Sequence, residues 1–139
     1  MVEKNTDYDV IIAGGGPAGL SSLLWCAELG LTAILIEKEP EFGGQLLHTH
    51  NSIKNYLGIE AVNGRELRDI FLRQIEKAKI KRLTGAEIVE ADLTQKSVTL
   101  ADGTKYSSRA IIIATGVRRR KLIVPGEEEL RGRGILESG

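Results

Sequence analysis

Apolar and polar residues follow three distinct patterns over the first 37 positions. Residues 8–13 are an apolar run rich in β-branched side chains that stops at three glycines, which is typical of a buried parallel strand. Residues 17–30 carry leucine and alanine at helical spacing, with Pro17 at the start of the segment and Gly30 at its end. Residues 32–37 form a second apolar run. The pattern predicts a strand–helix–strand unit of about 30 residues.

Two longer segments follow this unit. Residues 38–63 have weak periodicity and several glycines, so we expect mostly loop with one helical turn after Gly44. A loop of that length inside a compact domain usually has a function. Residues 64–78 place apolar side chains along one face and charged side chains along the other, which predicts an amphipathic helix.

The second half of the chain alternates apolar and polar residues in short pieces. Residues 87–91, 97–100 and 105–107 have the pattern of antiparallel strands, with a turn at residues 101–104. Residues 110–114 are again fully apolar, as expected for a buried strand. We therefore predict an α/β fold, a Rossmann-type parallel sheet that carries a small antiparallel β-meander.

Composition narrows the classes of function. The chain has 139 residues, of which 42% are hydrophobic, and its 19 basic residues balance 19 acidic ones, which describes one neutral globular domain. A neutral balance disfavours nucleic acid as a main partner. The N-terminal residues predict no targeting signal, and no apolar run approaches the ~18 residues of a membrane span. We expect no membrane partner.

The cysteine and histidine content argues against metal and disulfide chemistry. Cys26 is the single cysteine, which excludes an intrachain disulfide and makes a reducing, cytoplasmic location the simplest expectation. Trp25 and Cys26 are expected to be packing residues of the first helix. His48 and His50 lack further ligands nearby, so we predict no metal site.

The glycines after the first strand satisfy the pattern G-x-G-x-x-G. Gly14 would permit the sharp turn, Gly16 the approach of a pyrophosphate, and Gly19 the close packing of helix on strand. The phosphates would then lie near Pro17 and Ala18, because unpaired N–H groups and the helix dipole favour an anion there. The context of strand, turn and helix makes this a dinucleotide fingerprint.

A carboxylate ends the second predicted strand. Glu37 follows Gly19 by 18 residues, where an acceptor for ribose hydroxyls is needed, and its charge disfavours a 2′-phosphate. An ordinary α/β turn with a chance glutamate is the structural alternative. The fingerprint does not distinguish FAD from NAD, because both contain the adenosine pyrophosphate half. The NAD-binding domain of a dehydrogenase therefore stays open at this point.

Several further motifs occur in a specific order along the chain. The motifs are Gly14–Gly19, Glu37-Lys38, Gly43-Gly44-Gln45-Leu46, Asn55-Tyr56-Leu57-Gly58, Ala114-Thr115-Gly116 and Pro125-Gly126-Glu127. Together they resemble the N-terminal FAD segment of the thioredoxin reductases and their relatives over nearly the whole chain, from Asp9 to Gly134.

This resemblance implies positions for the parts of FAD. Residues 43–46 would lie along the flavin side, and Asn55 close to the isoalloxazine or the ribityl chain. The backbone around Ile88 would face the adenine, and residues 114–116 would end the strand that returns under the cofactor. The complete predicted cofactor-binding set is Gly14, Gly16, Pro17, Ala18, Gly19, Glu37, Lys38, Gly43, Gly44, Gln45, Leu46, Asn55, Ile88, Ala114, Thr115 and Gly116.

The chain departs from the family pattern in two ways. Ser138 falls where the first cysteine of the family's C-x-x-C dithiol is expected, and a hydroxyl cannot replace a thiolate in disulfide exchange. In the family, a nicotinamide domain and a returning FAD segment come after the part that this chain resembles. We therefore expect residues 1–117 to form the N-terminal FAD segment and residues 118–139 a linker.

The function predicted from these observations is FAD binding, as the N-terminal part of a thioredoxin-reductase-like flavin oxidoreductase. In a complete relative, NAD(P)H would pass hydride to the flavin. We assign no catalytic residue to this chain, because the flavin does the chemistry and the protein positions it. A non-catalytic or truncated flavin- or nucleotide-binding module is the alternative. A second copy of the chain is considered as a partner.

Overall fold

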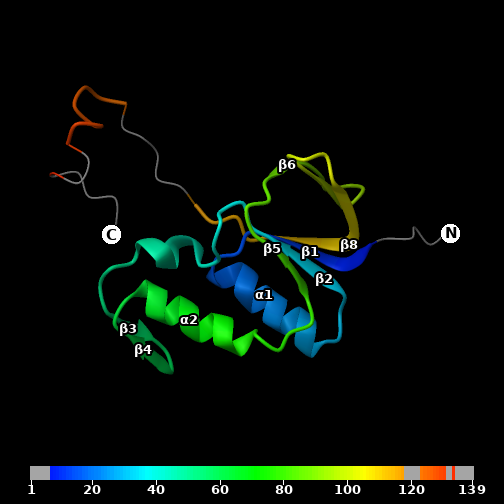
Figure 1. Cartoon of the computed structure of the whole chain (residues 1–139), viewed down its shortest axis with the longest axis horizontal. Coiled ribbons are helices and arrows are strands. Elements are labelled where there is room, and N and C mark those ends of the chain that lie inside the picture. Colours follow the sequence, from blue (N-terminus) through cyan, green and yellow to red (C-terminus); the bar gives the residue numbers. More distant parts are fainter. Residues whose placement is uncertain (1–6, 118–122, 131–132, 134–139) are drawn as a thin grey trace.

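The computed structural model describes residues 7–117, 123–130 and 133 (Figure 1). One sheet dominates it, with six strands in the order β5-β2-β1-β8-β7-β6, and β3 and β4 form a separate hairpin. The elements in chain order are β1 (Tyr8–Ala13), α1 (Pro17–Glu28), β2 (Ala33–Ile36), the 3-10 helix η1 (Gly44–His48), β3 (Ile53–Tyr56), β4 (Ile59–Ala61), α2 (Gly64–Gln74), β5 (Lys81–Leu83), β6 (Ile88–Asp92), β7 (Ser97–Leu100) and β8 (Lys105–Ile113).

The centre of the sheet is parallel. Strand β1 pairs with β2 on one side and with β8 on the other, and β2 pairs with β5. Strands β6, β7 and the start of β8 pair antiparallel. The predicted α/β fold, a Rossmann-type parallel sheet with an antiparallel meander, is confirmed.

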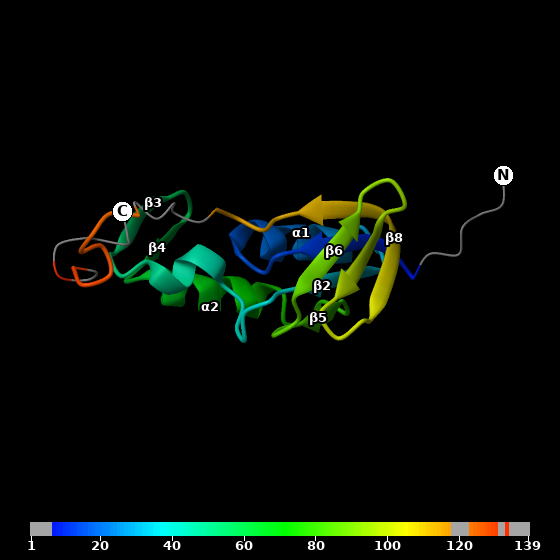
Figure 2. The ribbon, with the colours of Figure 1, turned by 90° about the horizontal axis from the view of Figure 1, so that it is seen from above.

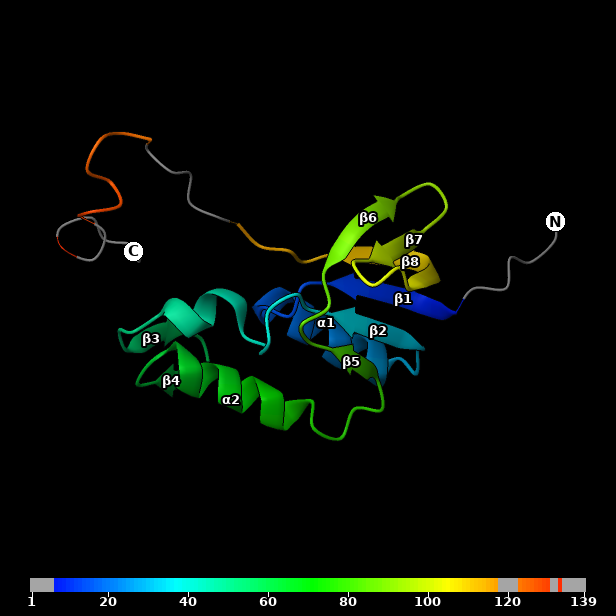
Figure 3. The same cartoon turned by 45° about the horizontal axis from the view of Figure 1, so that its top comes forward.

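Alternate residues of the central strands face two different layers. Val10 and Ile12 of β1 pack with α1 and with Ile75 after α2, whereas Ile11 packs with Val98 and Leu100 of the meander. In Figure 3, β6 and β7 lie above β1 and β2, whereas α2 lies below these two strands. Because both faces are covered, β1 and β2 need apolar residues at every position, which explains their continuous apolar runs.

Helix α1 buries one face and exposes the other. Leu20, Leu23 and Cys26 are buried, as expected from helical spacing. The helix ends where Gly30 N–H donates to Ala27 O and Leu31 N–H to Cys26 O. The expectation that Trp25 is a packing residue is wrong, because its side chain lies on the outer face of the helix and is 63% exposed.

The segment after β2 contains more structure than its sequence pattern predicts. The helical turn expected after Gly44 is confirmed as η1, but the hairpin of β3 and β4 was missed. The hairpin lies at the end of the molecule opposite the meander (Figure 2). Its strands have only four and three residues, most of them exposed, so the alternation of apolar and polar residues is too short to predict strands.

Three further elements, α2, β5 and β8, also differ from the prediction. Helix α2 ends at Gln74, before the predicted end at residue 78, because the chain turns there to form β5. Strand β5 was missed, since it is short and two of its three residues are exposed. The two predicted strands 105–107 and 110–114 are one strand, β8, which pairs with β7 at its start and with β1 along the rest.

Candidate functional site

A cleft of about 800 Å³ opens at the carboxyl ends of β1, β2 and β8. Ligands of parallel α/β sheets bind at this edge, outside the ends of the strands. The volume lies at the upper end of the range for small-molecule and cofactor sites. The lining residues come from five regions of the chain: the turn after β1, the segment from β2 through η1, the start of α2 with Arg65, the start of β6, and the segment after β8.

The turn from β1 to α1 is built on close backbone contacts. Gly14 has φ +105°, and a Cβ there would lie 2.3 Å from the carbonyl oxygen of Ala114. A Cβ at Gly19 would lie 1.8 Å from the carbonyl oxygen of Gly14. Both positions therefore exclude every larger residue. The roles expected for Gly14 in the turn and Gly19 in helix packing are confirmed.

Gly16 differs from these two glycines because the space above it is open. The nearest atom to a Cβ built there is the Cα of Gly44, at 3.8 Å. Gly16 caps α1 without any side-chain hydrogen bond. Within the described part of the chain, the N–H groups of Gly16 and Ala18 have no acceptor. Two free donors at a helix N-terminus thus border the cleft, which is the arrangement that favours an anion.

The carboxylate of Glu37 holds the glycine turn in place. Its Oε2 accepts a hydrogen bond of 2.6 Å from the N–H of Gly15, and Oε1 accepts one of 2.9 Å from Glu39 N–H. The side chain is buried with the residue only 7% exposed. The backbone of Glu37 accepts from Ala86 N–H at 2.9 Å, and this brings the start of β6 to the cleft.

A second pair of glycines lies against the first turn. Gly43 has φ +135° and donates its N–H to the carbonyl of Gly15 at 2.9 Å. A Cβ on Gly44 would lie 3.0 Å from the Cα of Gly16. The next residue, Gln45, donates from Nε2 to the carbonyl of Val117 at 3.0 Å. Segments some 70 residues apart in sequence therefore meet at the cleft.

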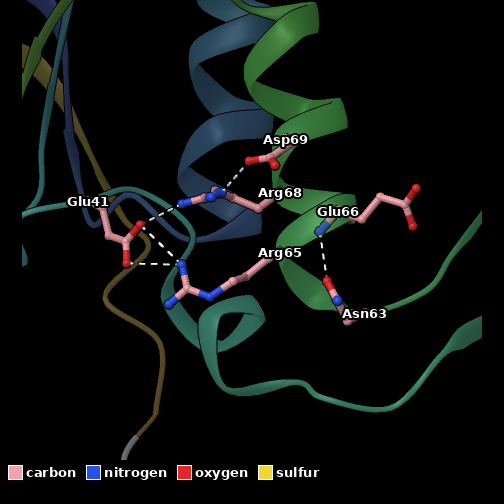
Figure 4. A network of polar contacts seen from close by, with 6 residues as sticks. All are labelled: Glu41, Asn63, Arg65, Glu66, Arg68 and Asp69. Carbon is pink, nitrogen blue, oxygen red and sulfur yellow. Dashed lines mark hydrogen bonds and ion pairs between the residues drawn. The ribbon is translucent and has the colours of Figure 1, made fainter.

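An ion-pair network connects the segment after β2 to helix α2 (Figure 4). Arg68 Nη1 lies 2.7 Å from Glu41 Oε2, and Arg65 Nη1 lies 3.3 Å from Glu41 Oε1. Arg68 Nε also lies 2.8 Å from Asp69 Oδ1. The hydrogen bond from Arg68, helped by the charge of Arg65, holds the pKa of Glu41 below its ordinary value. Glu41 is therefore ionised at neutral pH.

Most of the predicted cofactor residues line this one cleft. Gly19 and Gly43 are buried behind it, and Leu46 lies half-buried in η1 outside its lining. Asn55 is exposed on β3 and lines a separate surface depression at the hairpin. The predicted residues that line the cleft are Gly14, Gly16, Pro17, Ala18, Glu37, Lys38, Gly44, Gln45, Ile88, Ala114, Thr115 and Gly116.

The cleft also contains residues that the sequence pattern did not single out. Among them are the charged residues Glu41, Arg65 and Glu87. Glu87 directly precedes Ile88, so its sequence position could have drawn attention to it. Arg65 stands on the polar side of an amphipathic helix, and nothing in the sequence distinguishes it from the other charged residues there.

Cysteine and histidine do not form a reactive site in the described residues. The thiol of Cys26 is buried, and burial raises its pKa above the ordinary value. His48 lines the cleft and His50 does not. No three His, Cys, Asp or Glu side chains come together as a metal site within the described ranges. Ser138 lies outside the described residues.

The two described helices are both too short to cross a bilayer, and no described helix has a window apolar enough to do so.

Comparison with known proteins assigns a family to residues 8–138, which match the model of the pyridine nucleotide-disulphide oxidoreductases. A thioredoxin reductase of Listeria monocytogenes is 38% identical to the chain over an alignment of 142 residues. The alignment covers 97% of this chain and 42% of that protein. A thioredoxin reductase of Bacillus subtilis is 36% identical over 128 residues, which cover 92% of this chain and 40% of that protein.

Solved structures agree with this assignment. The crystal structure of Lactococcus lactis thioredoxin reductase in its FR conformation superposes with a TM-score of 0.79 at 33% sequence identity. The match covers 89% of this chain and 40% of that one. The chain thus spans about two fifths of the length of the thioredoxin reductases it matches.

Proposed function

This chain belongs to the pyridine nucleotide-disulphide oxidoreductase family, and on that premise we propose that the cleft at the ends of β1, β2 and β8 binds FAD. The observation that carries the proposal is the open face of the glycine turn. Gly16 leaves room above its Cα, and the N–H groups of Gly16 and Ala18 border that room without acceptors in the described part of the chain. A pyrophosphate supplies the acceptors that such donors need.

The residues around the turn fit a dinucleotide in other respects. Each carboxylate oxygen of Glu37 accepts one hydrogen bond within the chain, and a carboxylate has about four acceptor positions. Glu37 can therefore accept from ribose hydroxyls while it continues to hold the turn. The carboxylates of Glu37 and Glu39 disfavour a 2′-phosphate at this end of the cleft, which supports an adenosine ribose with free hydroxyls.

The contacts proposed for the rest of the cofactor follow the lining of the cleft. We assign the backbone beside Ile88 to the adenine, and Gly44 and Gln45 to the side of the flavin. The segment 114–116 lies against Gly14 and would pass beneath the cofactor. Asn55 and Leu46 are left out of the proposed contact set, because neither lines the cleft.

The chemistry proposed for the whole protein is that of a flavin oxidoreductase. FAD, when bound, would supply a group that accepts hydride from NAD(P)H and passes electrons onward. The residues that line the cleft would bind and orient the cofactor. They offer no accessible thiol to an acceptor, since Cys26 is buried with a raised pKa. We propose residues 1–117 as the FAD segment and residues 118–139 as a link to the nicotinamide-binding part of a longer protein.

Two further parts of the proposal concern the setting of the protein. A single, buried cysteine is compatible with a reducing, cytoplasmic location. The cleft is lined by exposed residues such as Thr115 and Val117, and contacts from a second copy of the chain would complete it. Sedimentation with and without FAD tests this assembly, and an unchanged monomer in both conditions would contradict it.

The central experiment compares FAD with FMN by titration of the purified chain. We expect FAD to bind more tightly, because the glycine turn, the helix N-terminus and Glu37 address the adenosine pyrophosphate that FMN lacks. Absorbance bands at about 450 and about 370 nm indicate the oxidised flavin. Equal or tighter binding of FMN would remove the proposal. Preference for NAD over FAD would favour the dehydrogenase alternative.

A further inference from the structure

The charge balance of the cleft points to a second requirement for a pyrophosphate. Four carboxylates line the cleft, namely Glu37, Glu39, Glu41 and Glu87, and they would repel a ligand with two negative charges. The lysine and arginine side chains in the lining are those of Lys38 and Arg65. The ammonium of Lys38 lies 3.6 Å from Glu39 and partly neutralises it. Arg65 is therefore the cation to consider.

Arg65 and Arg68 share Glu41 unequally. Arg68 lies at 2.7 Å and is only 14% exposed, whereas the Nη1 of Arg65 lies 3.3 and 3.4 Å from the two carboxylate oxygens and its side chain is 54% exposed. Glu41 would keep its shorter ion pair, with Arg68, if Arg65 turned away, and Arg68 also pairs with Asp69. A half-exposed guanidinium with one engaged nitrogen keeps most of its five donors available.

Glu41 connects this cation to the loop that packs on the glycine turn. Glu41 stands two residues before Gly43, whose N–H donates to the carbonyl of Gly15. The aliphatic part of Arg68 also touches this segment, because a Cβ on Gly43 would lie 3.0 Å from Arg68 Cγ. The start of α2 is thus held against the same loop that packs on Gly15 and Gly16. Arg65 extends from this helix toward Glu41 (Figure 4), and both residues line the cleft.

We propose that Arg65 is a phosphate-binding residue of this cleft, held ready by Glu41 and free to exchange that carboxylate for the diphosphate of the bound dinucleotide. Glu41 keeps its ion pair with Arg68 when this exchange occurs. The inference rests on the proposed function, since the diphosphate belongs to FAD. Guanidinium groups suit this role because their planar donors match phosphate oxygens in pairs.

The test measures the affinity of the whole chain for FAD and for ADP, which carries the diphosphate without the flavin. Arg65→Gln removes the charge and leaves a shorter, polar side chain. Arg65→Lys keeps a charge without the paired donors. The control is Arg73→Gln, on the same helix but outside the cleft lining. The unfolding midpoint of each variant without ligand shows whether the fold is intact.

We expect Arg65→Gln to lower the affinity for both ligands about tenfold at low salt. The affinity of Arg65→Lys should lie between those of Arg65→Gln and the wild type, and that of Arg73→Gln should equal the wild-type value. The difference in affinity should shrink near 1 M salt, where the Debye length is about 3 Å and exposed charges further apart are screened. Unchanged affinities in Arg65→Gln would overturn the inference and leave FAD binding standing. A loss that persists in high salt and comes with a lower unfolding midpoint would also overturn it, since Arg65 would then only support the loop.

Two results separate this inference from the proposed function. If the wild type binds ADP but not FAD, the proposed function fails and the ADP affinities of the variants decide the role of Arg65. If the wild type binds neither ligand, both proposals fail.

Discussion

Two adjoining segments build most of the cleft, and they are stabilised in opposite ways. Residues 8–37 form the strand–helix–strand unit, whose central strands are almost wholly buried between two layers. Residues 38–63 are mostly exposed or half-buried. They are held by individual long-range contacts: Gly43 to Gly15, Glu41 to Arg68 and Gln45 to Val117.

One wall of the cleft, from residues 8–37, is therefore part of the core, and the other, from residues 38–63, is attached to that core. In the first segment, a change of one atom meets backbone atoms that cannot move, because interiors are close-packed. In the second, each contact is a separate polar link whose loss leaves the others in place. Substitutions should therefore destabilise the first segment strongly and the second weakly.

The largest difference is expected between Gly19→Ala and Gly58→Ala. The new methyl group at position 19 would lie 1.8 Å from the carbonyl oxygen of Gly14, so the helix would have to leave the strand. We expect a loss of about 3 kcal/mol or more, or failure to fold. At position 58 no atom lies within 4 Å, and the cost is that of φ +85°, about 1 kcal/mol.

Urea unfolding of the two variants measures this difference. Similar losses of unfolding free energy at positions 19 and 58 would contradict the contrast between a packed and an attached wall.

The next effect concerns ligand affinity without loss of the fold. Gly16 has φ −76°, which valine adopts readily, and its Cβ position is open except for Gly44 Cα at 3.8 Å. Gly16→Val should therefore change the unfolding free energy by about 1 kcal/mol or less and weaken FAD by at least about 100-fold, because its methyl groups occupy the place of the phosphates. Circular dichroism and an FAD titration check both parts. Retention of FAD by a folded variant would show that the phosphates lie elsewhere.

A smaller effect is expected where Glu37 joins the two segments. In Glu37→Gln, one carboxylate oxygen becomes an amide NH₂ that cannot accept from the N–H of Gly15 or Glu39. A buried donor left without its partner costs about 1–3 kcal/mol, so the unfolding free energy should fall by this amount. Glu87→Gln is the control, because Glu87 is exposed in the same cleft. If both variants unfold alike, Glu37 does not hold the turn.

The smallest effect is expected at Glu41, and it depends on pH. The pKa of Glu41 is lowered from its ordinary 4.5, chiefly by the hydrogen bond from Arg68, so its contribution to stability is complete above 4.5 and disappears as the pH falls through the lowered value. Glu41→Gln should be slightly less stable than the wild type at pH 7. Thermal unfolding from pH 7 to pH 3 should show the two midpoints converge. A constant gap would mean that the charge of Glu41 is not what holds the loop.

Sequence patterns predict those parts of the fold whose signal lies within one segment. The apolar runs of β1 and β2, the helical spacing of α1 and the glycine turn all fall within about 30 residues, although distant residues such as Ile75, Val98 and Leu100 complete the burial of β1. The turn residues Gly14 and Gly19 could be assigned in advance because a Cβ at either position would meet backbone atoms, and Gly16 because a bound pyrophosphate would need the open space above it. The same holds for Glu37, whose place follows from the length of the unit.

Elements whose partners are distant were missed or divided. Strand β5 is three residues long, with Lys81 and Arg82 exposed, and it forms only because β2 offers a parallel edge. Strand β8 appeared as two pieces because it changes partners near Ser108, where its pattern of burial changes. The hairpin of β3 and β4 has strands of only four and three residues, and these are too short for their apolar positions to reveal it.

Residue types and their spacing within one segment were enough to predict the strand–helix–strand unit, the glycine turn and the class of ligand that such a turn favours. Only the tertiary structure decided which residues surround the cleft. It placed Arg65 there and Asn55 elsewhere, and it gave Glu41 two arginine partners from α2. The physical reason is that charged side chains look alike in sequence. Their roles are set by the partners that folding brings within a few ångströms.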